Sequence, residues 1–305
     1  MKNITALTSS MNRNQFLKNT IDKCQNINNL NSHIIIDYSS ITPVKDALNV
    51  NYDNLIIYRV ENQKVWSISR AYNAGLSLVE TEYILKIDAD VEINFDLINT
   101  FDYENYDLII FLHNENDVGN WLMKKKLIEN VNGFNEFLFA VYDDHDLIKR
   151  VRSLNPNLKE IIVKDGITKI EHSDELRVPH DRSLFLKKDE NYFYAIKKAY
   201  NDYSGYISKN NFWSKNNARN YKINENTIQI NHFYSHKDTG LTTYIMCKYI
   251  FLSTFFRIYF KDSNNLILSI YKRVMPYVLL PLTLRMLKNI FGFDVFPLSI
   301  QIDNV

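Results

Sequence analysis

Cysteine is scarce in this sequence of 305 residues, which contains only Cys24 and Cys247. The two cysteines lie far apart and lack the close spacing of zinc ligands, so the sequence indicates neither a disulfide framework nor a zinc site. We therefore expect a reducing compartment. The first residues, MKNITALTSSMNRNQ, also lack an apolar run of signal-peptide length, and we expect the body of the protein to stay in the cytoplasm.

An excess of either charge is also absent, since 36 basic and 35 acidic residues give a formal net charge of +1. Nucleic-acid binding rewards a strong basic excess that meets the phosphates, so we expect no nucleic-acid partner. The hydrophobic fraction of 46% and the charged fraction of 23% are ordinary for a folded protein and exclude a disordered chain. The length allows one large domain, or one domain with an appendage.

No apolar run is long enough to span a membrane, although the sequence becomes more apolar after Leu241. A spanning helix needs about 20 mostly uncharged apolar residues, and basic residues such as Lys248 and Arg257 interrupt this region. We interpret it as basic amphipathic helices that lie on a membrane surface. A helical cap on the rest of the chain, or a dimer contact, stays an alternative because periodicity alone does not separate them.

In the first half of the sequence, short apolar runs alternate with amphipathic stretches of helical period. The runs include HIIIDYSS, NLIIYRV and YILKIDADVEI, and the helical stretches include NQFLKNTIDKCQNI and SISRAYNAGLSLVE. This alternation predicts an α/β domain with a largely parallel sheet. Ligands of such sheets bind at the carboxyl ends of the strands, so the polar residues after each run are candidate site residues. They are Thr8, Ser9, Arg13, Asp37, Ser39, Asp88 and Asp90.

The segment KIDADVEI places Asp88 and Asp90, one residue apart, directly after an apolar run. If the chain turns there, both carboxylates reach one divalent cation, which acts as a Lewis acid on the leaving diphosphate of a nucleotide-sugar. A lone Asp-x-Asp also occurs in many solvated turns. The apolar frame YILKI before it and the helical stretch upstream favour the metal-binding interpretation.

A second group of acids opens the segment DDHDLIKRVRSL. The segment predicts a helix whose acids lie in the first turn and whose basic residues lie later, as the helix dipole favours. Asp143 and Asp144 are candidate functional groups, since a carboxylate can accept a proton. Capping of the helix N-terminus is the alternative role. Like charges so close together would be costly without a positive partner, which favours the catalytic interpretation.

The order of these motifs resembles that of GT-A glycosyltransferases of family 2, including the β-1,4-galactosyltransferase and chondroitin-polymerase type. In that family a segment similar to S-x-x-R-N-x-G precedes the Asp-x-Asp strand, and here SISRAYNAG supplies Ser69, Arg70 and Asn73. Downstream, the family carries Gly-Phe-x-Glu and then Gly-Trp-Gly-Gly-Glu-Asp-Asp-Asp-Leu, where this chain has GFNE and FAVYDDHDL. The resemblance covers about residues 1–180. It implies a Rossmann-like, nucleotide-sugar-binding mixed sheet flanked by helices, with a C-terminal helical extension.

The resemblance also implies an inverting transferase that moves a sugar from a UDP-sugar to a saccharide acceptor. It assigns the role of catalytic base to Asp144 and places Asp143 where the family has glutamate. It implies that Mn²⁺ or Mg²⁺ is held by Asp88, Asp90 and His172. For the nucleotide and its diphosphate it implies contacts from Thr8, Ser9, Arg13, Asp37, Arg70, Asn73 and Asp88.

Under this interpretation, residues 1–235 form the catalytic domain and residues 236–305 form the basic helical region. A membrane-facing C-terminal region would suit a lipid-linked saccharide acceptor, with the enzyme on the inner face of a bacterial membrane in capsule or lipopolysaccharide synthesis. Two departures from the family pattern leave the acceptor open. Residues 139–142 replace Gly-Trp-Gly-Gly, and His145 replaces an acid.

Two other functions stay open at the level of the sequence. A nucleotidyltransferase acting on sugar phosphates shares the nucleotide-binding sheet and the acidic metal site, but usually has a glycine-rich N-terminal loop that cradles a triphosphate. The corresponding segment here, ITALTSSMNRNQ, contains no glycine. A noncatalytic sugar-binding or scaffold protein is the other alternative, and the presence of both Asp143 and Asp144 argues against it.

Overall fold

The computed structural model describes residues 3–63, 66–113, 118–138, 142–170, 190–210, 213–214, 217, 221–231 and 240–259. The chain divides into two compact units. The first is formed by Met1–His180 with Trp213–Phe233, and the second by Asp181–Phe212 with Tyr234–Val305. The predicted division at residue 235 stays a prediction.

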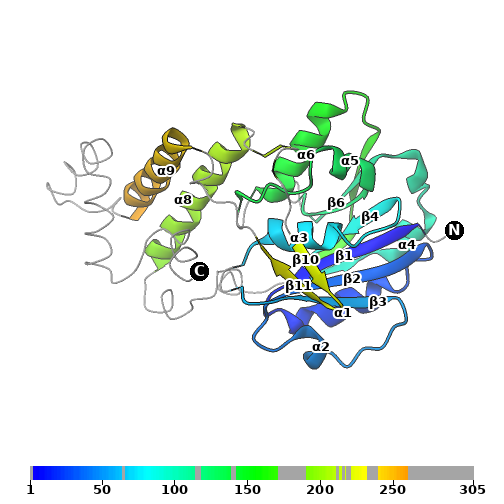
Figure 1. The fold of residues 1–305 in the computed structure, drawn as a ribbon. Coiled ribbons are helices and arrows are strands. Elements are labelled where there is room, and N and C mark those ends of the chain that lie inside the picture. The colour runs from blue at the N-terminus through cyan, green and yellow to red at the C-terminus, as the bar shows by residue number, and fades with distance from the viewer. Residues whose placement is uncertain are drawn as a thin grey trace, which may run out of the picture. The chain divides into compact units, whose positions relative to one another are not determined.

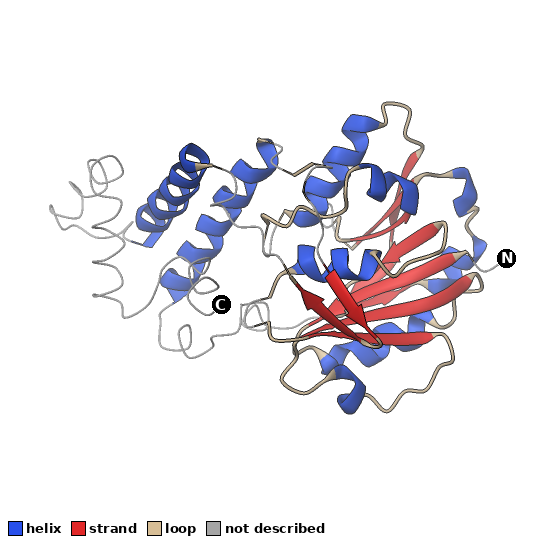
Figure 2. Cartoon of the chain, in the orientation of Figure 1, coloured by secondary structure: helices blue, strands red, loops and turns tan. Residues whose placement is uncertain are grey.

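The described part of the first unit is built on a nine-stranded mixed sheet (Figures 1 and 2). Its strands, in spatial order, are β10 (Tyr221–Asn224), β11 (Thr227–Ile230), β3 (Leu55–Val60), β2 (Leu30–Tyr38), β1 (Ile4–Ser10), β4 (Tyr83–Lys86), β7 (Asn120–Lys124), β6 (Leu108–Leu112) and β8 (Glu160–Lys164). The pairs β3–β2, β2–β1 and β1–β4 are parallel, whereas β7 runs antiparallel to β4 and β6. A two-stranded sheet pairs β5 (Val91–Ile93) with β9 (Ile167–Lys169).

Helices cover both faces of the large sheet, which confirms the predicted α/β class with a mixed sheet flanked by helices (Figure 2). One face packs against α1 (Asn14–Cys24), α2 (Val44–Ala47) and α4 (Phe95–Thr100), and the other against α3 (Ile68–Leu76), α5 (Lys125–Asn130) and α6 (Asp143–Leu154). Successive strand residues alternate between these faces. In β7, Trp121 and Met123 join the core beneath α3 and α6, whereas Leu122 joins the core on the α4 side.

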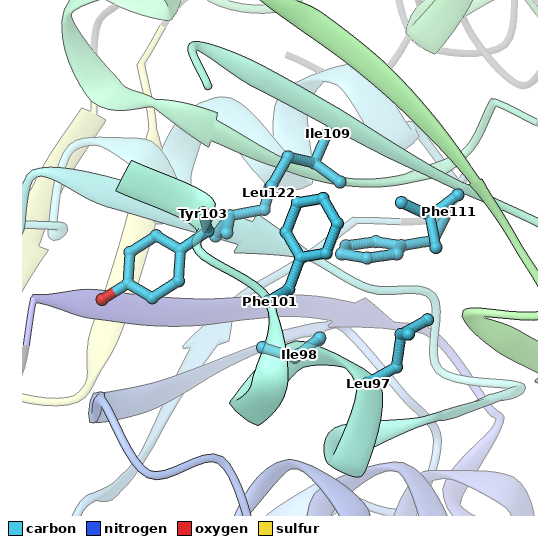
Figure 3. Close-up of a pocket in the computed structure, with 8 residues that line it drawn as sticks. Leu97, Ile98, Phe101, Tyr103, Ile109, Phe111 and Leu122 are labelled. Atoms are coloured by element: carbon cyan, nitrogen blue, oxygen red, sulfur yellow. The ribbon is translucent and has the colours of Figure 1, made fainter. Parts of the chain in front are cut away.

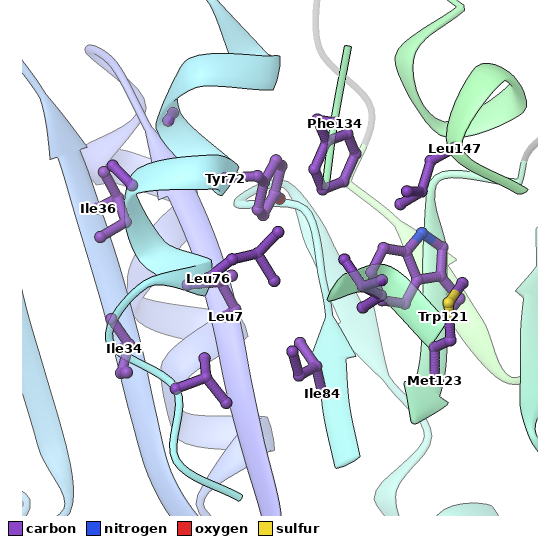
Figure 4. Close-up of a cluster of buried hydrophobic side chains, with 14 of the residues drawn as sticks. Leu7, Ile34, Ile36, Tyr72, Leu76, Ile84, Trp121, Met123, Phe134 and Leu147 are labelled. Atoms are coloured by element: carbon purple, nitrogen blue, oxygen red, sulfur yellow. The ribbon is translucent and has the colours of Figure 1, made fainter. Parts of the chain in front are cut away.

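The core beneath α3 is rich in aromatic rings (Figure 4). Tyr72 stacks on Phe134 with ring centroids 5.3 Å apart, and Phe134 stacks on Trp121 at 6.3 Å. A Cβ at Gly75 would overlap the side chain of Leu7, so glycine at this position allows α3 to lie close against β1. The side chains of Lys86 and Trp121 lie on this packed face of the sheet.

The sequence between residues 181 and 235 has weak periodicity, so it gave no clear prediction of helices or strands. Its described parts nevertheless form regular secondary structure. They contain α8 (Glu190–Lys209) and the β10–β11 hairpin. The hairpin extends the large sheet, because β11 pairs in parallel with β3 and buries Ile228 completely. Strands of four residues carry too little alternation to be recognised, and the pairing that stabilises this one is distant in sequence.

In the second unit, α8 packs against α9 (Leu241–Tyr259). The buried side chains of α9 include Cys247, Phe251 and Phe255, which recur at helical spacing. Thr254 Oγ1 of α9 donates to Asp202 Oδ2 of α8 at 2.6 Å. Among the described helices, none combines the length and the apolar character needed to cross a membrane.

Candidate active site

Several predicted site residues lie at the carboxyl ends of neighbouring parallel strands. Asp37 lies near the end of β2, Arg13 follows β1, and Asp90 follows β4. The strand order reverses between β1 and β4, and α/β sheets bind ligands outside the carboxyl ends of their strands at such a point. An ion pair joins the segments that follow β1 and β4, since Arg13 Nη1 lies 2.8 Å from Asp90 Oδ2.

A fully buried lysine at the end of β4 links the two acidic motifs. Lys86 Nζ donates to Asp88 Oδ1 at 2.9 Å, to Asp144 Oδ2 at 3.0 Å and to the carbonyl oxygen of Gly119. The ring of Tyr72 lies 4.6 Å from the same ammonium, and the Tyr72 hydroxyl donates to Asp88 Oδ1 at 3.3 Å. The structure therefore brings Asp88 and Asp144, which are distant in sequence, to one positive charge.

The second oxygen of Asp144 has its own buried donor. Trp121 Nε1 donates to Asp144 Oδ1 at 2.9 Å. Lys86 and Trp121 are direct partners across the antiparallel β4–β7 pair, so their side chains lie on the same face of the sheet. Asp144 is the second residue of α6, yet its oxygens bind these two strand residues. Its described contacts are therefore not those of a helix cap.

These contacts include four residues that the sequence analysis did not identify, namely Tyr72, Lys86, Asn120 and Trp121. Asn120 is fully buried, and its Oδ1 accepts from the backbone N–H of Asp88 at 2.8 Å. Lys86 could have been predicted from its position inside the apolar run YILKI. A lysine in a buried strand is seldom without an acidic partner, so a nearby carboxylate was to be expected. Nothing in the local sequence distinguishes Trp121 from an ordinary core residue.

Burial and mutual repulsion change the acidity of the carboxyl groups near Lys86. Burial raises the pKa of Asp143 to about 6, against the opposing effect of the Lys86 charge. Burial also raises the pKa of Asp144 well above its usual range, with Asp143 and Asp88 adding to the shift and Lys86 opposing it. The pKa of Lys86 is raised because its acidic neighbours outweigh the effect of burial. Three carboxyl groups thus lie near one ammonium, so the cluster carries a net negative charge when all of them are ionised.

Replacing Asp143 with asparagine should change the pH dependence of stability. An acid whose pKa is higher in the folded state than its ordinary value of 3.8 makes the folded state lose stability as pH rises from about 4 to about 6. Asp143→Asn abolishes this loss. We expect the variant to gain about 3 kcal/mol relative to the parent protein between pH 4 and pH 7. Urea unfolding at a series of pH values in metal-free buffer measures the difference, and a pH-independent difference would contradict the raised pKa.

The residue before α6 has an unusual backbone conformation. Tyr142 has φ of 68°, in the left-handed region that bulky residues rarely adopt, and the residue is 43% exposed. Such conformations are concentrated at functional sites, where the surrounding structure holds them in place. The chain reaches Asp143 and Asp144 through this strained residue.

Asp37 uses both of its oxygens within the protein. The backbone N–H of Ser40 donates to Oδ1 at 2.9 Å, and that of Val44 donates to Oδ2 at 3.1 Å. Arg59 Nη1 donates to Oδ2 at 2.6 Å. Asp37 is almost fully buried and holds the loop after β2. Its role toward the nucleotide stays a prediction.

Arg70 and Asn73 lie fully buried on α3. Asn73 Nδ2 donates to the carbonyl of Phe134 and to Glu136 Oε1, each at 2.9 Å, while Asn73 Oδ1 accepts from the backbone N–H of Phe134 at 2.7 Å. Asn73 therefore joins α3 to the GFNE segment. The charge of Arg70 acts on Tyr38. Contacts of Arg70 and Asn73 with a diphosphate stay predictions.

Thr8 and Ser9 are buried at the end of β1. Thr8 Oγ1 lies 3.0 Å from His33 Nε2, and burial lowers the pKa of His33 to about 3, so this histidine is neutral. Ser9 lies near Tyr72. His172, predicted as a metal ligand, lies outside the described residues.

Asp88 and Asp90 fit a divalent cation by their chemistry, since hard cations take carboxylate oxygens. The side chains of Asp88 and Asp90 are 26% and 10% exposed, so Asp88 is partly accessible and Asp90 is nearly buried. Within the described residues, no three His, Cys, Asp or Glu side chains are arranged around a common metal position. A cation here would therefore take its remaining ligands from a bound diphosphate or from water, as Mg²⁺ commonly does.

A separate small pocket lies on the opposite face of the sheet (Figure 3). Its lining includes Phe101, Ile109, Phe111, Leu122 and Val163, all of them apolar. Tyr103 also lines the pocket, but its hydroxyl is hydrogen-bonded to Asn3 and Asn29, and the lining has no charged group that would bind a diphosphate.

Residues 5–155, about half of the chain, match the model of the family described as glycosyl transferase family 2. This segment of the chain is therefore similar in sequence to family 2 glycosyltransferases. The more specific resemblance to the β-1,4-galactosyltransferase and chondroitin-polymerase type stays a prediction. A search of the curated proteins found no match.

Several solved structures are similar in fold. Glucosyl-3-phosphoglycerate synthase from Mycobacterium tuberculosis, in complex with Mn²⁺, UDP and phosphoglyceric acid, has a TM-score of 0.49 at 8% identity, over 76% of this chain and 88% of that chain. The same synthase with Mg²⁺ and UDP has a TM-score of 0.44 at 11% identity, over 57% and 74% of the two chains. The 4-diphosphocytidyl-2C-methyl-D-erythritol synthase from Anaerococcus prevotii has a TM-score of 0.43 at 15% identity, over 57% and 93%.

Proposed function

We propose that this protein is an inverting glycosyltransferase that moves a sugar from a UDP-sugar to a saccharide acceptor, with Asp144 as the catalytic base. The observation that carries the proposal is the contact of Asp144 and Asp88 with the same buried Lys86, within the segment that matches the family 2 model. Asp88 of the Asp-x-Asp segment and Asp144 of the acidic helix start thus both contact the ammonium of Lys86.

In this mechanism the acceptor hydroxyl approaches Asp144, which takes its proton as the oxygen attacks the anomeric carbon from the face opposite UDP. Burial raises the pKa of Asp144, which makes its carboxylate a stronger base. Asp88 and Asp90 would hold Mn²⁺ or Mg²⁺, which supplies Lewis-acid stabilisation to the leaving diphosphate when bound. Arg13, paired with Asp90 at the strand ends, lies where it can contact the same phosphates. His172 is proposed as a further ligand.

The proposed acceptor is a growing bacterial surface polysaccharide of the capsule or lipopolysaccharide type, carried on a lipid. The second unit supports a peripheral membrane role through its exposed groups. On α9, Ile245 and Met246 are 44% and 37% exposed, and the Arg257 side chain is 72% exposed. A helix that binds an anionic membrane surface combines exposed apolar side chains, which insert into the interface, with basic side chains, which attract the lipid headgroups.

The test of the proposal is UDP release from UDP-glucose, UDP-galactose, UDP-N-acetylglucosamine and UDP-N-acetylgalactosamine in the presence of Mn²⁺. We expect one donor to be consumed, and Asp88→Asn to reduce that consumption by at least about 100-fold, because the cation loses a ligand and the charge that attracts it. Release of pyrophosphate from UTP and a sugar 1-phosphate, without use of any UDP-sugar, would instead identify a nucleotidyltransferase. Consumption of no nucleotide substrate would favour a noncatalytic role.

A further inference from the structure

The carboxylate of Asp144 is held at both of its oxygens by side chains from two adjacent strands of the sheet. Oδ2 accepts from Lys86 Nζ at 3.0 Å, and Oδ1 accepts from Trp121 Nε1 at 2.9 Å. Both donors are fully buried, and they are direct cross-strand partners in β4 and β7. The position and the rotation of this carboxylate are therefore set by the rigid centre of the sheet.

The indole of Trp121 is itself fixed. Its ring stacks on Phe134, and Figure 4 shows it packed beside Leu147 and Met123 in the core. A buried indole N–H requires an acceptor, and among the described contacts that acceptor is Asp144. A phenylalanine would fill most of the same space without offering a donor.

The remaining geometry leaves the carboxylate available to a substrate. Each carboxylate oxygen accepts more than one hydrogen bond, so the contacts with Lys86 and Trp121 do not exhaust Asp144. The Asp144 side chain is 11% exposed. A carboxylate with a fixed orientation and some exposed surface can meet a hydroxyl at a defined angle, as a general base requires.

We propose that Trp121 is a positioning residue, whose indole N–H orients the Asp144 carboxylate for proton transfer. This inference rests on the proposed function, in which Asp144 is the catalytic base. Trp121 contacts neither donor nor acceptor in this scheme, so its loss should lower the turnover number and leave the affinity for the donor nearly unchanged.

The test is Trp121→Phe, assayed as UDP release from the most active of the four UDP-sugars above, with water as acceptor and Mn²⁺ present. Loss of a hydrogen bond to a charged group should lower kcat by about tenfold or more, with KM for the UDP-sugar changed less than about twofold. The matched control is Trp213→Phe, because Trp213 is also buried and its Nε1 donates to the backbone carbonyl of Asn132 at 2.9 Å. The control should lose thermal stability to a similar degree and keep kcat.

Four outcomes separate the explanations. Equal kcat in the two tryptophan variants, with Asp144→Asn inactive, would overturn the positioning role and leave the proposed function intact. Full activity of Asp144→Asn would overturn the proposed function itself. A fall in kcat for Trp121→Phe alone supports the inference. If Trp121→Phe does not fold, benzothienylalanine at position 121 keeps the ring shape and replaces the N–H with sulfur, and an unchanged kcat in that protein would overturn the inference.

Discussion

Asp144→Asn should lower the turnover number by about 100- to 10,000-fold, which is the contribution that a positioned general base makes. Asparagine has nearly the same shape, so packing at the start of α6 should be kept. The amide cannot take a proton from an attacking hydroxyl. Its NH₂ group would also face either Lys86 or Trp121, both of which are donors to the native carboxylate.

The matched control for this variant is Asp96→Asn. Asp96 is exposed and lies in the first turn of α4, so the substitution removes the same charge from a helix start at a different place. Its activity should equal that of the parent protein. UDP release under saturating UDP-sugar measures both variants, and circular dichroism verifies that each is folded. Activity of Asp144→Asn within about threefold of the control would exclude Asp144 as the base.

Lys86→Met should have the largest effect on stability. The substitution removes the positive charge from a buried site and leaves Asp88, Asp143 and Asp144 without their compensating partner. Breaking a buried ion pair from one side costs about 3–5 kcal/mol, because the remaining charge stays buried. We expect a loss of that size in the free energy of unfolding at pH 7, measured by urea denaturation.

Lys124→Met provides the comparison for this prediction. Lys124 also lies on a strand and pairs with an aspartate, Asp107, at 2.8 Å, but the two side chains are 30% and 25% exposed. Such exposed pairs contribute about 1 kcal/mol or less. The double variant Lys86→Met with Asp144→Asn should be more stable than the sum of the two single losses predicts, since one buried charge disappears with its partner. Similar losses for Lys86→Met and Lys124→Met would show that burial of the lysine does not decide its contribution.

Much of the fold could be predicted from local patterns. Helical period and acids in the first turn predicted a helix over DDHDLIKRVRSL, and α6 spans Asp143–Leu154. The strand ending before Asp88 was equally clear, because an apolar run gives way to polar residues there. The β10–β11 hairpin was not predicted, since its short strands depend on a pairing with β3 that is distant in sequence.

In the candidate site, too, some residues could be predicted from the local sequence and others could not. Residue type and position after an apolar strand predicted Asp88 and Asp90 as site residues, whereas Asp144 was predicted from the acidic start of a helix and from the family resemblance. The hydrogen-bond partners of these acids could not be predicted from the local sequence. Lys86 and Trp121 become neighbours only when β4 pairs with β7, and Asp144 reaches them only when α6 packs on that face.

The sequence by itself determined the α/β class, the alternation of strands and helices in the first half of the chain, and the positions of Asp88 and Asp90 after an apolar strand. Each of these follows from interactions among residues that are close along the chain. Only the tertiary structure decided that Asp144 is held by Lys86 and Trp121, that Asp90 pairs with Arg13, and that Asp37, Arg70 and Asn73 are buried. Burial and cross-strand pairing depend on the whole fold, and they set the orientation of the Asp144 carboxylate and the acidity of Asp143 and Asp144.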